Sequence, residues 1–179
     1  MDGWEVIGDY DTRIYRRETI SANGSVLWSN QSLGAVDSSV NEVAVVNFIE
    51  RLSDDDVVPF WHELYRICAH AADVRLVGAY WSSIDVQADV TRKRGLSERM
   101  IAHLSVPGRV SLRLDPLEDG IGVAPFDGVD FEPNKIVHIA DPEWECRTNE
   151  AKNWALAHSI NVVRRLEASL SVVKPCRIP

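Results

Sequence analysis

The sequence predicts an α+β fold, in which an antiparallel sheet packs against a pair of helices and a long C-terminal helix. Three patterns predict it: a helical spacing of apolar residues from Phe60 to Ala72, short alternating segments between residues 74 and 140, and a second helical spacing from Leu156 to Leu170. We expect all 179 residues to form one domain, with residues 171–179 as a short C-terminal tail, because a chain of this length usually folds around one core.

Residues 4–29 are predicted to form a β-hairpin. Apolar and polar residues alternate from Trp4 to Ile20, as they do in a strand with one buried face. Asn23-Gly24 favours a tight turn of type I′, in which both central residues need positive φ. Ser25–Ser29 would then be the returning strand.

Two helices are predicted next. Ser39 and Glu42 have the spacing of a capping box, so the first helix is expected to run to Leu52, although its β-branched residues leave a strand as the alternative. The second is expected to begin after the acidic residues 54–56, because negative charge is favourable at the N-terminal end of a helix. Its apolar side chains share one wide face: Phe60, Trp61, Leu64, Tyr65, Ile67, Cys68, Ala71 and Ala72.

Short alternating segments then predict the antiparallel sheet. They cover residues 74–81, 84–91, 100–106, 109–114 and 135–140. Asp141-Pro142-Glu143 predicts the start of the last helix, because Asp can cap a helix and Pro suits its first position. That helix is expected to bury one stripe: Leu156, Ile160, Val163, Leu166 and Leu170.

The order of these elements resembles the helix-grip architecture of START-like and Bet v 1-like proteins, from which the added N-terminal strand departs. In that architecture a curved sheet wraps a long terminal helix around an apolar cavity. The resemblance implies a domain that holds an apolar small molecule, with Tyr80, Trp81 and Trp154 lining the cavity. We keep this as an alternative function.

The composition narrows the classes of partner. Lys and Arg total 19 against 27 Asp and Glu, and the net charge of −8 disfavours nucleic acid and anionic lipid. The absence of a long apolar run and of a signal-like N-terminus predicts a cytoplasmic protein without membrane contact. Three scattered cysteines predict free thiols and neither a disulfide framework nor a zinc site: Cys68, Cys146 and Cys176. No cofactor or metal is expected.

Residues 115–133 form an acidic segment, with six carboxylates and no Lys or Arg. Aromatic anchors among acids suit the recognition of a basic protein surface, although the rings could instead fold onto the sheet while the acids face water. We therefore expect a non-enzymatic binding domain of the inhibitor, immunity-protein or adaptor type. Its partner-binding residues would be Asp115, Glu118, Asp119, Phe126, Asp127, Asp130, Phe131 and Glu132.

Two histidines supply a second alternative. His103-Leu104-Ser105-Val106 is similar to the H-x-[ST]-x motif of 2H phosphoesterases, whereas the sequence from His138 has Ala140 in the hydroxyl position. The resemblance implies that His103 and His138 act as acid and base on a phosphodiester. A zinc protease is excluded, because the HExxH-like sequence that begins at His62 has Arg66 in place of the second histidine.

Overall fold

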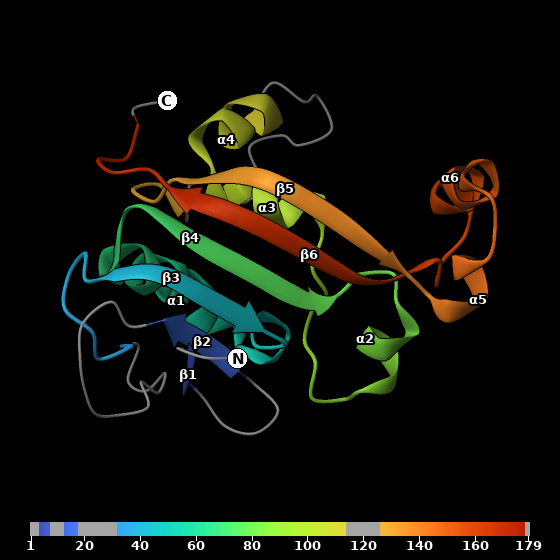
Figure 1. Cartoon of the computed structure of the whole chain (residues 1–179), viewed down its shortest axis with the longest axis horizontal. Helices are drawn as coiled ribbons and strands as arrows, with labels where there is room; N and C mark the ends of the chain where they lie inside the picture. The colour runs from blue at the N-terminus through green and yellow to red at the C-terminus, as the bar shows by residue number, and fades with distance from the viewer. Residues whose placement is uncertain (1–3, 8–12, 18–31, 114–125, 178–179) are drawn as a thin grey trace.

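The computed structural model describes residues 4–7, 13–17, 32–113 and 126–177. It contains a mixed sheet with the strand order β1-β2-β3-β4-β6-β5 (Figure 1). The strands are β1 (Trp4–Ile7), β2 (Arg13–Arg17), β3 (Val40–Val46), β4 (Cys68–Ala79), β5 (Phe131–Ala140) and β6 (Val163–Val172). The helices are the 3-10 helix η1 (Ile49–Arg51), α1 (Asp54–Ile67), α2 (Ile84–Ala88), α3 (Glu98–Leu104), α4 (Val106–Arg113), α5 (Pro142–Glu145) and α6 (Asn149–His158).

One pair of strands in the sheet is parallel. β3 and β4 run in the same direction, with Val43 opposite Val74 and Val45 opposite Leu76, and α1 connects them. The other neighbouring strands are antiparallel. The prediction of an antiparallel sheet is therefore wrong, because the chain crosses over through α1 before it returns to the sheet.

The predicted C-terminal helix is also wrong. Two short helices, α5 and α6, project from one end of the sheet, and the chain then forms β6 (Figure 1). Leu166, Ala168 and Leu170 are buried at every second position, as in a strand, while Leu156 and Ile160 are 43% and 61% exposed. The described residues thus do not form the helix-grip architecture.

Among the remaining predictions, those for the longer elements are confirmed and those for the shorter elements are wrong. The second predicted helix is confirmed as α1, which buries Phe60, Trp61, Leu64 and Ile67. Strands are also confirmed within residues 74–81 and 135–140, which overlap β4 and β5. The first predicted helix is instead β3 followed by η1, and the predicted strands within residues 84–114 are the short helices α2, α3 and α4.

The N-terminal prediction is only partly open to comparison. β1 and β2 pair in antiparallel fashion, with Val6 opposite Tyr15, inside the range predicted as one strand. Asn23-Gly24 and the predicted returning strand Ser25–Ser29 lie outside the described residues.

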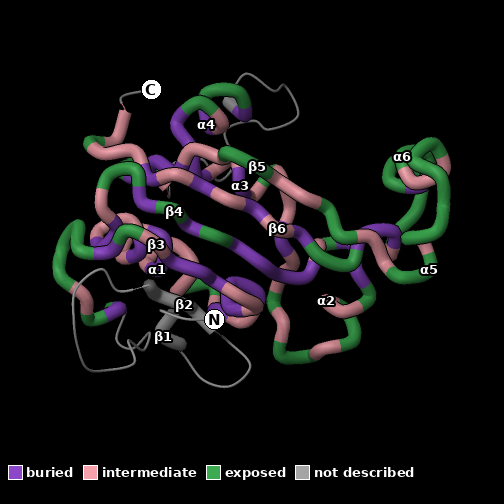
Figure 2. Tube along the Cα trace, viewed as in Figure 1, coloured by how far each residue is buried: buried purple, intermediate pink, exposed green. Residues whose placement is uncertain are grey.

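The core lies between the sheet and the helices α1 and α3. It includes an aromatic series in which neighbouring ring centroids lie 5.1–5.7 Å apart: Phe48, Phe60, Trp61, Phe131 and Tyr65. In β4, buried and exposed residues alternate from Ala72 to Leu76, and residues 76–79 are all buried (Figure 2).

The opposite face of the sheet carries charged side chains from β4, β5 and β6. It has a shallow depression of about 180 Å³, lined by Asp73, Arg75, Lys135, Val137, Glu167, Ala168 and Ser169. Cys68, Cys146 and Cys176 are free thiols, as expected. In the part of the chain that is described, no helix is both long and apolar enough to cross a membrane.

Candidate functional site

The candidate site lies where the parallel strands end. In open α/β sheets, ligands bind outside the carboxyl ends of parallel strands. Tyr80 and Trp81 directly follow β4, and their backbone is held by hydrogen bonds to the carbonyls of Arg164 and Leu96. β5 reaches the same edge, because its His138 lies opposite Leu166 of β6, which in turn lies opposite Gly78 of β4.

A carboxylate joins two of these side chains. Glu98 is the first residue of α3, and the Ser97 hydroxyl caps that helix by accepting a hydrogen bond from the amide of Met100 at 3.1 Å. Nε2 of His138 bonds to Oε1 of Glu98. The Tyr80 hydroxyl donates to both oxygens of Glu98, at 3.3 and 3.2 Å. The strand end, the helix start and β5 therefore meet at one carboxylate.

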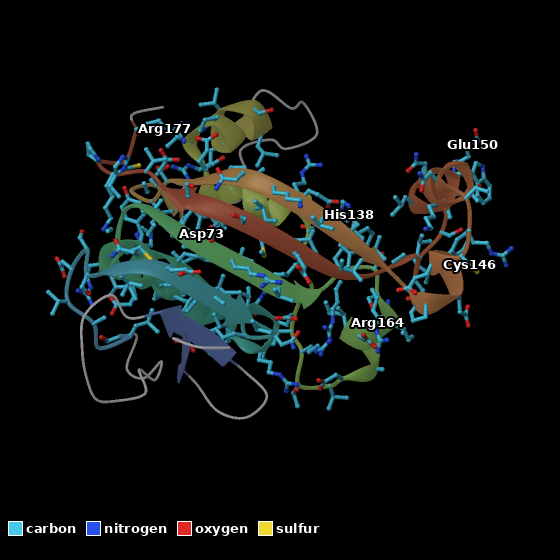
Figure 3. All side chains as sticks on the ribbon, in the orientation of Figure 1. Asp73, His138, Cys146, Glu150, Arg164 and Arg177 are labelled. Carbon is cyan, nitrogen blue, oxygen red and sulfur yellow. The ribbon has the colours of Figure 1, made fainter. Side chains whose placement is uncertain are left out.

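The imidazole of His138 is fixed by packing as well as by this bond. The Tyr80 ring stands at 89° to the His138 ring, with 5.4 Å between the ring centroids. The His138 side chain is one-third exposed, and Figure 3 shows it on β5. Among the described residues, no hydrogen-bond partner is found for its other ring nitrogen, Nδ1.

This arrangement determines which nitrogen of the neutral His138 ring carries the proton. An ionised carboxylate can only accept hydrogen bonds, so Nε2 carries the proton and Nδ1 keeps its lone pair. A histidine whose N–H is held by a carboxylate is oriented for general-base catalysis, and the carboxylate stabilises the imidazolium that forms. Nδ1 of His138 is therefore the basic atom of the site.

Tyr80 remains a hydrogen-bond donor in this arrangement. Burial raises the pKa of the Tyr80 phenol and the Glu98 carboxylate raises it further, while a hydrogen bond from Trp81 lowers it. The rings of Tyr80 and Trp81 lie 6.0 Å apart between centroids. Trp81, Tyr80, Glu98 and His138 thus form one connected series of side chains.

The acidic segment predicted to bind a partner is largely tied into the fold. Asp130 and Phe131 are fully buried, and Arg177 forms ion pairs with both Asp130 and Glu132. Asp127 lies 3.9 Å from Nε of the buried Arg109.

Only part of that segment can be located. The ring of Phe126 faces His103, with 6.1 Å between centroids, and Phe126 packs against the core. Asp115, Glu118 and Asp119 lie outside the described residues. No Lys or Arg lies within the segment itself, but Arg109 and Arg177 reach three of its acids from elsewhere in the chain.

The two histidines of the phosphoesterase alternative have different surroundings. His103 lies on α3, where it faces Phe126, and not on a strand as predicted. His138 lies on β5 and bonds to Glu98. Sequence reasoning singled out His138 but missed Glu98, whose only signal was its place after a capping serine at a helix start.

Comparison with known proteins yields structural likeness alone. No protein-family model and no curated protein matches this chain. A SAM-dependent methyltransferase structure from Methanosarcina mazei matches 83% of this chain at 11% identity and a TM-score of 0.45. A second SAM-dependent methyltransferase, from Archaeoglobus fulgidus, matches 76% at 12% identity and a TM-score of 0.44. The YcgJ protein of Bacillus subtilis matches 82% at 11% identity and a TM-score of 0.48.

This chain spans 66%, 61% and 69% of the lengths of those three structures, in the same order. At such identities and TM-scores, the likeness carries no activity over to this chain.

The functions expected from the sequence are corrected. The inhibitor, immunity-protein or adaptor interpretation is wrong, because Asp130 and Phe131, on which it rested, are fully buried and Arg177 forms ion pairs with Asp130 and Glu132. The apolar-ligand alternative needed a terminal helix, where the chain forms β6. The phosphoesterase alternative needed His103 on a strand, and it lies on α3.

Proposed function

We propose that this chain carries the proton-accepting part of an enzyme active site, with Nδ1 of His138 as the general base. The observation that carries the proposal is the bond between His138 and Glu98 at the carboxyl end of the parallel strands. Location and chemistry agree there, because that edge is the usual ligand site of an open α/β sheet and a carboxylate-oriented imidazole is a typical general base.

The step itself is a single proton transfer. The O–H or N–H bond of a substrate breaks, its proton moves to Nδ1 of His138, and the electron pair left on oxygen or nitrogen makes that atom a nucleophile. Glu98 is a positioning residue that keeps the proton on Nε2 and balances the charge of the imidazolium. Tyr80 holds Glu98 in place through its hydroxyl. General-base assistance of this kind contributes roughly 10²–10⁴-fold to a rate.

The tautomer of His138 tests the proposal directly. In ¹⁵N NMR spectra of the neutral ring, we expect a protonated Nε2 and an unprotonated Nδ1. Glu98→Gln should mix the two tautomers, because an amide can donate as well as accept. His158 serves as the control ring, since its Nδ1 contacts the carbonyl of Trp154 and not a carboxylate. A neutral His138 protonated on Nδ1 would contradict the proposal.

The second test is functional. Small neutral molecules with a hydroxyl or amine group are screened for binding, and the readout is the shift of the His138 ring signals. The screen is run with and without SAM, because two of the matching structures are named SAM-dependent methyltransferases. We expect shifts at His138 that Glu98→Gln reduces, while the His158 signals stay unchanged. If no such molecule moves the His138 signals, the site is not an active site.

A further inference from the structure

Three exposed apolar side chains lie on segments that adjoin the candidate site. Trp81, Ile84 and Ile160 are 56%, 51% and 61% exposed. They belong to two segments that are held together, because the amide of Asn161 donates to the carbonyl of Ser82 at 3.1 Å. We name Trp81, Ile84 and Ile160 the apolar rim. Exposed apolar groups grouped beside polar catalytic groups are typical of a ligand site.

The charges within the connected series of side chains favour a neutral ligand. The connected series Trp81, Tyr80, Glu98 and His138 has one carboxylate and no ammonium or guanidinium group. A phosphate or carboxylate ligand would therefore meet a like charge at Glu98, without an opposite charge in the series to offset it. Trp81 offers a broad planar surface against which another ring can stack.

The basic atom narrows the ligand further. An unperturbed phenolic hydroxyl has a pKa of about 10, whereas water has one of about 15.7 and aliphatic alcohols are similarly weak acids. An imidazole can therefore deprotonate a phenol far more readily than an aliphatic alcohol. Centroid separations of 6.0 Å from Trp81 to Tyr80 and 5.4 Å from Tyr80 to His138 suit a ligand with more than one ring.

We infer that the substrate of this site is a neutral, planar aromatic molecule with a phenolic hydroxyl, whose rings lie against Trp81 while the hydroxyl reaches Nδ1 of His138. The inference rests on the proposed function, because it assigns a substrate class to the same base. On binding, the phenolic O–H bond breaks, the N–H bond at Nδ1 forms, and the phenolate is held beside the imidazolium.

The test uses 2-naphthol, whose absorbance reports its ionisation. We expect 2-naphthol to bind the wild-type chain and to shift the His138 ring signals. At the same pH, a larger fraction of the bound 2-naphthol than of the free 2-naphthol should be ionised to naphtholate. Trp81→Ala should weaken binding about tenfold, the scale of one lost aromatic contact. Trp154→Ala is the matched control, because Trp154 is 63% exposed and lies on α6, and it should leave the affinity unchanged.

Two further ligands test the chemical class. Decahydro-2-naphthol keeps the hydroxyl without planar rings and should bind more weakly. 2-Naphthoate keeps the rings with a negative charge and should bind more weakly still. Equal affinity for 2-naphthoate, or an equal effect of the two tryptophan changes, would overturn the inference. So would sedimentation showing that Trp81→Ala abolishes self-association, because a second copy would then cover the apolar rim.

The inference and the proposed function can fail separately. If 2-naphthol binds at Trp81 but His138→Gln leaves its ionisation unchanged, the aromatic ligand class is supported and the general base is wrong. If the His138 tautomer is as expected and 2-naphthol does not bind, the general base stands and the aromatic class is wrong.

Discussion

Arg177 donates two parallel hydrogen bonds to Asp130, from Nε at 2.5 Å and from Nη2 at 2.8 Å. The Asp130 side chain is fully buried and also accepts from the amide of Val106 at 3.0 Å. Burial alone would raise the pKa of Asp130, but the hydrogen bonds from Arg177 and Val106 outweigh it and hold the pKa below its usual range. Arg177 therefore fixes the segment after β6 to the start of β5.

Removing Arg177 should destabilise the fold strongly. Arg177→Met leaves a buried carboxylate without its cation, and we expect a loss of roughly 3 kcal/mol in the free energy of unfolding, measured by urea denaturation. Arg147→Met is the control, because Arg147 is exposed beside α5 and should have little effect. Equal stability of the two variants would show that the pair with Asp130 contributes nothing.

The pair formed by Glu63 and Arg66 should appear in the acid denaturation of the chain. Hydrogen bonds from Arg66 lower the pKa of Glu63 from 4.5 to about 2, burial opposes them, and the amide of Leu33 adds to them. Because the folded pKa is depressed, the stabilisation is complete above the unfolded pKa and is lost as the pH falls from about 4.5 to about 2.

We expect that loss to be on the order of 2 kcal/mol, after allowance for the solvent around the half-exposed Arg66. Glu63→Gln should be less stable than wild type at neutral pH and should lack this part of the acid transition. Parallel pH curves for the two proteins would contradict the assignment.

Glu50 should respond to pH in the opposite direction. Its carboxylate accepts from the amide of Ala79 at 2.8 Å, and burial raises its pKa above 4.5. The ionised form therefore costs stability at neutral pH, and stability from this group grows as the pH falls through the folded pKa. Glu50→Gln keeps an acceptor for Ala79 without the charge, so we expect a higher melting temperature at pH 7. A lower melting temperature would show that the charge itself is needed.

Gly95 should tolerate no side chain, because it packs against the backbone of Trp81. A Cβ atom at Gly95 would lie 2.5 Å from Cα of Trp81 and 2.8 Å from its amide nitrogen. We expect Gly95→Ala to cost about 1–3 kcal/mol, as overpacking does, and to weaken 2-naphthol binding by displacing Trp81. Asn153→Ala, an exposed change on α6, should alter neither quantity. Unchanged stability in Gly95→Ala would show that the backbone around Trp81 shifts to accommodate the added methyl group at no cost in free energy.

Truncating a buried side chain of β6 should destabilise the fold, whereas truncating an exposed side chain in the segment before β6 should not. Leu166→Ala removes a fully buried side chain and should cost roughly 2–5 kcal/mol. Ile160→Ala, at a position predicted to be buried in a helix but in fact 61% exposed, should cost less than about 0.5 kcal/mol. A large cost at Ile160 would show that the apolar rim is covered in solution.

Local patterns predicted α1, which is long and strongly periodic. α1 has a continuous helical spacing and an acidic first turn, and both lie within its own sequence. β3 was predicted as a helix because the spacing of Ser39 and Glu42 is a signal within the local sequence. The pairing of Val43 with Val74, which makes β3 a strand, is a contact between residues far apart in sequence. Helices α2, α3 and α4 have five to eight residues, too few for a period to separate helix from strand.

The candidate site was only partly predictable for the same reason. His138 stood out as a histidine in a predicted strand, and it does lie on β5. Its partner Glu98 is 40 residues away in sequence, and the two meet only because α3 packs against β5. Arg177 likewise lies 47 residues from Asp130. No spacing rule within one element relates such pairs.

Among the described strands, β6 is the last in the chain, yet it lies between β4 and β5 in the sheet. During synthesis, both edges that it will join remain unpaired until residues 163–172 have left the ribosome. Open strand edges of this kind can pair with other chains. Up to that point in translation the sheet is divided, with Tyr80 after β4 on one piece and His138 of β5 on the other. Completion of the sheet and assembly of the site are thus one late event.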